Sequence, residues 1–159
     1  GVDDDLDDGD QSTNITLAVN DASSDDAFDS TSETAAVTTT DDDTTGFTVT
    51  ETGGGTIVAE NGSSDTFDVV LDVEPLDVVV FEVTSLDTTE VEVSPTTLTF
   101  STGNWDQPQT VTVTGQDDAI VDGAQVSTTR IRVDDAATND NSFDPLPDQT
   151  VSVTTNDND

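Results

Sequence analysis

The sequence predicts an all-β domain, a Greek-key sandwich of about seven antiparallel strands that forms one unit of a tandem repeat. Apolar residues alternate with polar ones at period two, and helical periodicity is absent. Turn residues separate the apolar rows at roughly the 8 to 12 residue spacing that is typical of sandwiches. The third observation is an internal repeat of about 115 residues.

The repeat is visible when two segments are placed side by side. The run GVDDDLDDGDQ at residues 1–11 recurs as GQDDAIVDGAQ at residues 115–125. This offset predicts that residues 1–43 are the C-terminal part of one repeat and that residues 44–159 are one complete repeat. A part this small cannot bury much core, so it is either a remnant or is completed by another chain or by its neighbour.

Each expected strand of the complete repeat shows one apolar face. Seven rows follow one another: Phe67, Val69, Leu71 and Val73; Val79, Phe81 and Val83; Val91 and Val93; Leu98 and Phe100; Val111 and Val113; Ile131 and Val133; Val151 and Val153. Breakers such as Asn61-Gly62 and Ser94-Pro95 lie between them. Trp105, in the link before the fifth row, is expected to be a structural plug over the sheet edge rather than a platform for a ligand.

The charge balance excludes several functions. The chain of 159 residues has 36 acidic and 2 basic side chains, a formal net charge of −34. Such a surface repels nucleic-acid phosphates and anionic lipid headgroups, so we expect no nucleic acid partner and no direct membrane insertion. Cations are the expected partners. The chain has no His, Cys, Tyr or Lys, which removes the commonest general base, the thiolate nucleophile and the usual zinc ligands. We therefore expect no enzymatic activity.

Acidic residues gather where expected strands begin or end. Ca²⁺ binds about six to eight oxygens, which loops that converge at one end of a sandwich supply most easily. In a seven-strand Greek key the start of the domain, one loop between strands and the end of the domain can share that end. The sequence therefore predicts a calcium site formed by Glu60, by Asp117, Asp118 and Asp122, and by Asp157 and Asp159.

The partial repeat carries the same features, and its acids lead directly into the complete repeat. Cations bound there would bridge neighbouring repeats and stiffen the link, because crowded carboxylates otherwise repel one another. The expected ligands in this copy are Asp3, Asp4, Asp8, Asp41, Asp42 and Asp43. By contrast, the acids at alternating positions within strands are expected to face solvent and to serve solubility: Asp65, Asp68, Asp72, Glu82, Glu90 and Glu92.

The complete repeat resembles the Calx-beta domain family. The resemblance rests on IVAENG at residues 57–62, TLTF at 97–100, QTVTVTG at 109–115, and the terminal DND. The NWDQPQ motif at 104–109 is especially similar to the tandem repeats of large bacterial surface proteins and adhesins. The resemblance implies an Ig-like sandwich that binds Ca²⁺ at one pole through the acids named above. The sequence departs from that pattern at Gln125, where the family often has Glu, and at Asn158.

The combined interpretation is a non-enzymatic, extracellular or cell-surface, Ca²⁺-stabilised repeat that acts as a rigid spacer or fibre module in an adhesin. Its partners would be calcium ions and neighbouring repeats of the same chain or fibre. Two alternatives stay open. One is a halophilic secreted wall or S-layer component without specific ion sites, and the other is a carbohydrate-binding or protein-binding module whose ligand lies on a Thr-rich face or at Trp105.

Overall fold

The computed structural model describes residues 1–2 and 4–159, so the predicted ligand Asp3 lies outside the described residues. The chain divides into two compact units, Gly1–Asp43 and Thr44–Asp159, which are called the first and the second unit below. No helix in the described part of the chain is long and apolar enough to cross a membrane.

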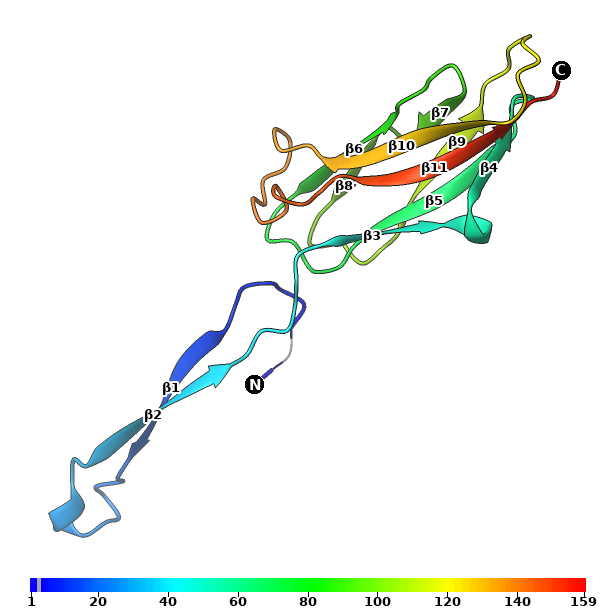
Figure 1. Ribbon diagram of the computed structural model, residues 1–159. Helices are drawn as coiled ribbons and strands as arrows, with labels where there is room; N and C mark the ends of the chain where they lie inside the picture. The colour runs from blue at the N-terminus through cyan, green and yellow to red at the C-terminus, as the bar shows by residue number, and fades with distance from the viewer. Residues whose placement is uncertain (3) are drawn as a thin grey trace. The chain divides into compact units, whose positions relative to one another are not determined.

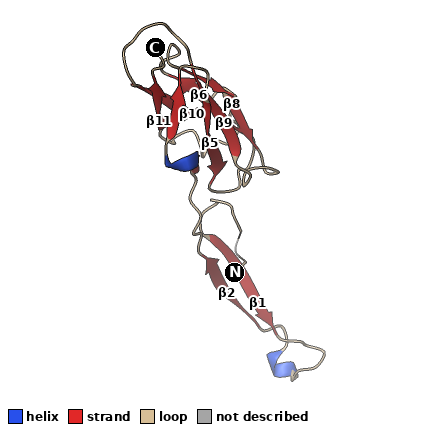
Figure 2. Ribbon diagram, turned by 90° about the vertical axis from the view of Figure 1, so that its right-hand side faces the viewer, coloured by secondary structure: helices blue, strands red, loops and turns tan. Residues whose placement is uncertain are grey.

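The first unit is a two-stranded antiparallel hairpin. Its strands are β1 (Gln11–Ala18) and β2 (Ser32–Thr39), and a single turn of 3₁₀ helix at Asp26–Phe28 lies in the loop that joins them (Figure 2). The Asp25 carboxylate begins this turn by accepting a hydrogen bond from the Ala27 N–H at 2.9 Å. The side chains of both strands are exposed, apart from the half-buried Thr39.

The second unit is a sandwich of two sheets (Figure 1). The five-stranded sheet has the order β4 (Thr56–Ala59), β11 (Gln149–Asn156), β10 (Gln125–Val133), β6 (Val79–Ser85), β8 (Thr97–Phe100). The four-stranded sheet has the order β3 (Phe47–Glu51), β5 (Ser64–Leu71), β9 (Gln109–Gly115), β7 (Val91–Ser94). The prediction of an all-β sandwich is therefore confirmed.

The core lies between the two sheets and consists of the predicted apolar rows. Val and Thr dominate the strands because β-branched side chains suit the pleated backbone, and alternate residues point inward. Phe81 contacts two other rings, with centroids 4.6 Å from Phe47 and 5.9 Å from Phe100. Burying a side chain of this kind stabilises the fold by about 1.5–3 kcal/mol. Trp105 is half-buried and packs against this core, as expected of a structural residue.

The structure contains two strands that the apolar rows did not indicate, β3 and β4. They are separated by Gly53–Gly55 and belong to different sheets, since β3 pairs with β5 and β4 pairs with β11. The β4–β11 pairing is parallel, whereas the sequence predicted antiparallel strands throughout. Each segment is too short to show a clear period, and the crossing between sheets is decided by packing. This parallel strand carries Glu60 to one end of the sandwich.

Candidate metal centre

Four segments bring carboxylates to the same end of the second unit. Strands β4, β9 and β11 end there, and β7 begins there. The pairing of Asn156 with Ala59 and of Val91 with Gly115 fixes this arrangement within each sheet. We call this end the acidic pole, and it comprises Glu60, Glu90, Asp117, Asp118, Asp122, Asp157 and Asp159.

A glycine allows the two sheets to close at the acidic pole. A Cβ atom at Gly115 would collide with the carbonyl oxygen of Ala59, so any larger residue would push β9 away from β4. The Gly115 N–H also donates to the Ser63 carbonyl at 3.0 Å. Since Glu60 follows Ala59 and the loop with Asp118 follows Gly115, this contact sets the distance between two predicted ligands.

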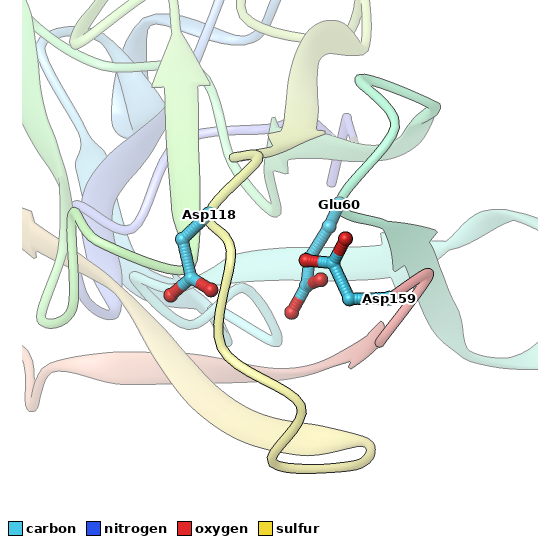
Figure 3. A group of neighbouring side chains, drawn as sticks. All are labelled: Glu60, Asp118 and Asp159. Carbon is cyan, nitrogen blue, oxygen red and sulfur yellow. The ribbon is translucent and has the colours of Figure 1, made fainter.

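Glu60, Asp118 and Asp159 meet at the acidic pole from three separate segments of the chain (Figure 3). One carboxylate oxygen of each lies within 4.8 Å of the other two. Two ligands that are each about 2.3–2.6 Å from one Ca²⁺ ion are at most about 5 Å apart, so this spacing suits a shared cation. These three residues are all among the predicted ligands.

The burial of Glu60 sets it apart from the other carboxylates at the acidic pole. Glu60 is 2% exposed, and the Asn158 N–H donates to it at 3.4 Å, a long hydrogen bond. Burial raises the pKa of Glu60; the Asn158 N–H lowers it, while the charges of Asp157, Asp118 and Asp122 raise it further. In this buried position the ionised form of the carboxylate is unfavourable unless a cation is bound nearby.

Asp140 shows how the same fold satisfies a buried carboxylate elsewhere. It is 6% exposed, and it accepts hydrogen bonds from the Leu76 N–H at 2.7 Å and from the Ser142 hydroxyl at 2.7 Å. Burial pushes its pKa upward, but these donors outweigh burial and the pKa is lowered. Glu60 is not supported in this way by donors from the described residues, and its pKa moves in the opposite direction.

Asp157 holds the loops of the acidic pole in place. Its two oxygens accept hydrogen bonds at 2.8 Å from the Asp159 N–H and the Gly123 N–H, and these bonds lower its pKa. Asp157 therefore positions both the C-terminal segment and the loop before β10. Asp117 is exposed and accepts from the Asn158 amide at 3.2 Å. Asp122 is also exposed, and its charge raises the pKa of Glu60.

Glu90 belongs to the acidic pole, and its predicted place on an outward strand face is wrong. It directly precedes β7 and is half-buried, and its Oε2 atom is buried with no hydrogen-bond partner among the described residues. Burial raises the pKa of Glu90, and the charges of Asp122, Asp87, Glu60 and Asp118 raise it further. The alternation with Glu92 suggested solvent exposure. Only the pairing of Val91 with Gly115 places Glu90 beside the acidic pole.

Other acids that were expected to face solvent also make local contacts. Asp65 accepts from the Ile57 N–H at 2.9 Å and the Thr66 N–H at 2.8 Å, and its pKa is lowered. Glu82 pairs with Arg132 at 2.6 Å. Asp68 accepts from the Thr110 hydroxyl at 2.6 Å. These groups already have partners on the protein.

The first unit repeats the loop geometry of the acidic pole without its buried glutamate. The Leu6 N–H donates to Asp4 at 3.2 Å and the Asp43 N–H donates to Asp41 at 2.9 Å. The corresponding bonds of the second unit join Ile120 to Asp118 and Asp159 to Asp157. A hollow of about 320 Å³ lies beside the acids of the first unit, among them Asp4, Asp8 and Asp41–Asp43. Among residues 1–2 and 4–43, no three carboxylates come as close together as Glu60, Asp118 and Asp159.

The chain resembles known proteins in its structure but not in its sequence. No protein-family model and no curated protein sequence matches the chain. Solved structures that resemble it include the apo form of the Calx CBD1 domain, at 16% identity and a TM-score of 0.44, over 71% of this chain and 98% of that chain. Another is the E. coli chaperone DraB, at 7% identity and a TM-score of 0.49, over 71% of this chain and 56% of that chain.

Surface-layer protein structures are also similar. Domains 1–6 of the surface layer protein SbsC match at 20% identity and a TM-score of 0.41, over 79% of this chain and 15% of that chain. Values in this range assign neither a family nor a function. The chemistry of the acidic pole is therefore inferred from its own residues.

Proposed function

We propose that the second unit is a non-enzymatic, Ca²⁺-binding β-sandwich repeat that serves as a rigid spacer or fibre module of an extracellular, cell-surface adhesin. The observation that carries this proposal is the buried carboxylate of Glu60, which lies beside Asp118 and Asp159. Calcium would neutralise the acidic pole and join the ends of β4, β9 and β11. The function that follows is mechanical: the ion stiffens the repeat.

No basic side chain neutralises the acidic pole in the described residues. The chain has two basic side chains, and each pairs elsewhere: Arg130 lies 3.8 Å from Asp148, and Arg132 lies 2.6 Å from Glu82. The charge of the acidic pole is therefore balanced by protons or by cations from solution. At neutral pH, where carboxylates are normally ionised, a cation is the better counter-charge.

The ligand chemistry favours calcium among the common metal ions. Every side chain at the acidic pole offers oxygen, and the chain has no His or Cys to select zinc or copper. Calcium accepts irregular sets of about six to eight oxygens, while magnesium demands a near-octahedral shell and keeps several waters. Glu60, Asp118 and Asp159 come from three separate segments, with Glu90 and Asp122 nearby, and such an irregular set of oxygens fits the larger ion better.

Thermal unfolding followed by circular dichroism tests this proposal. The chain is compared at one ionic strength in EGTA, in millimolar Ca²⁺, in millimolar Mg²⁺ and in matched NaCl. An ion that binds the folded state stabilises it by about 2.7 kcal/mol when its concentration is 100 times the Kd. We expect Ca²⁺ alone to raise the unfolding midpoint strongly. An equal rise of the unfolding midpoint in NaCl would support the halophilic alternative and would contradict a specific calcium site.

A pair of variants separates the site from general charge. Asp118→Asn removes one ligand of the acidic pole, and Asp135→Asn removes one exposed charge beyond the far end of β10. We expect the first to reduce the midpoint rise caused by Ca²⁺ and the second to leave it unchanged. Equal effects of both variants would contradict specific binding.

The carbohydrate-binding alternative has less support. A groove of about 520 Å³ beside β6, β7 and β8 is rich in Thr and Ser, but no aromatic side chain lines it. Trp105, the other candidate platform, packs against the core. Sugar-binding sites normally use aromatic faces together with a few placed polar groups.

A further inference from the structure

The hairpin of the first unit exposes an apolar face. Leu17 is 76% exposed and Phe28 is 61% exposed, and Ile15 and Val37 are also exposed. Large apolar side chains in such number on two strands and the loop that joins them are unusual for a surface that stays in water. A two-stranded hairpin is also marginally stable by itself, and both of its outer edges carry unpaired backbone groups.

The second unit contains the same hairpin in a buried state. By the internal repeat, Leu17 corresponds to Ile131, Val37 to Val153 and Phe28 to Phe143. Ile131 and Val153 are 0% exposed and Phe143 is 1% exposed. The face that the first unit exposes is thus the face that β10, β11 and their connecting loop bury inside the complete sandwich.

The strand register is identical in the two hairpins. Gln11 pairs with Thr39 in the first unit, and the corresponding Gln125 pairs with Thr155 in the second. Further along, Ile15 pairs with Ala35, while Thr129 pairs with Val151. A slip of one residue would turn every side chain to the other face, so the identical register preserves the shape of the apolar surface.

The loop before each hairpin is also held by the same bonds. The Gln11 amide donates at 3.0 Å to the carbonyls of Asp8 and Gly9. The Gln125 amide donates to the corresponding carbonyls of Asp122 and Gly123 at 3.2 and 3.3 Å. The first unit therefore has the geometry of β10 and β11 before any partner covers it.

In the second unit the covering strands are known. Strand β6 pairs antiparallel with β10, and β4 pairs parallel with β11, while the opposite sheet closes the core. All of them lie within residues 44–115, and the last of these residues, Gly115, corresponds to Gly1 at the start of the first unit. The interface that buries β10 and β11 therefore specifies what fits the hairpin of the first unit.

We propose that the hairpin of the first unit is an acceptor surface for a segment with the strand pattern of residues 44–114, supplied by another repeat of the same polypeptide. One strand of that segment adds antiparallel to residues 15–19, in the register of β6 on β10. A second strand adds parallel to residues 37–40, in the register of β4 on β11. The inference rests on packing and register, so it does not depend on the calcium proposal.

Hydrogen exchange on a fused chain tests the acceptor surface. The full chain is compared with the same chain preceded by a second copy of its own residues 44–114. Amides of β1 and β2 are expected to exchange about 100-fold more slowly in the fusion, because their opening then requires loss of the new sandwich. The amides of β10 and β11 report in the same sample that the second unit is folded.

Two variants of the fusion distinguish docking from local effects. Leu17→Asp puts a charge on the apolar face and is expected to abolish the protection of β1 and β2. Thr16→Asp, the matched control, puts the same charge on the other face of the hairpin and is expected to leave the protection of β1 and β2 unchanged. Equal exchange in the fusion and the unmodified chain, or protection that survives Leu17→Asp, would overturn the proposal. So would an unmodified chain that is dimeric with protected β1 and β2, because a second copy would then be the occupant.

Discussion

Replacing Gly115 by alanine tests how the two sheets position the acidic pole. The added Cβ would meet the backbone carbonyl of Ala59, which cannot rotate away as a side chain could. Overpacking of this kind costs about 1–3 kcal/mol. For a unit of this size we expect the unfolding midpoint to fall by about 5–15 °C. The clash also moves the end of β4, so the Ca²⁺-dependent rise of the midpoint is expected to shrink.

Gly103→Ala is the matched control, because the nearest atom to its new Cβ would be the Ser101 Oγ at 3.9 Å. Its backbone lies outside the left-handed region, so the change is expected to alter stability by less than about 1 kcal/mol. Both variants are measured by thermal unfolding in EGTA and in Ca²⁺. Identical midpoints for the two variants would refute the close approach of the sheets. A lowered midpoint with an unchanged response to Ca²⁺ would show that this contact does not position Glu60.

Three further predictions concern charge and core. Glu60→Gln should raise the unfolding midpoint in EGTA, by removing a buried charge, and lower it in Ca²⁺, by removing a ligand; a change of the same sign in both conditions would contradict the role of Glu60. The raised pKa values of Glu60 and Glu90 mean that the folded chain without Ca²⁺ holds their protons more tightly than the unfolded chain. Their protonation therefore stabilises the folded state fully at pH values below 4.5, the pKa in the unfolded chain. This stabilisation is lost as pH rises through the higher pKa of the folded chain. In urea titrations at a series of pH values, the free energy of unfolding of the metal-free chain should fall as pH rises through this range. It should fall less steeply in a Glu60→Gln, Glu90→Gln double variant, and equal slopes for the two proteins would contradict the prediction. Phe81→Ala should lower the free energy of unfolding by about 3–5 kcal/mol, measured by urea titration in EGTA and in Ca²⁺. A loss below about 1 kcal/mol would mean that Phe81 is not a central residue of the core.

Much of the fold follows from local patterns in the sequence. Alternating rows such as Phe67, Val69 and Leu71 indicate strands because successive side chains of a strand point to opposite faces. The sandwich follows because an apolar face must be covered by a second sheet. Part of the acidic pole was predictable as well, since Glu60 and Asp118 both follow strand ends, where loops gather.

The sequence alone determined the strand periodicity, the internal repeat and the lack of basic partners for the acids, because each is a property of neighbouring residues or of composition. Tertiary structure decided the rest. Three features depend on contacts between residues far apart in the chain: the parallel pairing of β4 with β11, the hydrogen bonds that make Asp157 a positioning group, and the position of Glu90 at the acidic pole. Alternation places Glu90 on the surface of an isolated strand. Its burial comes from the position of β7 beside β9, which no local pattern specifies.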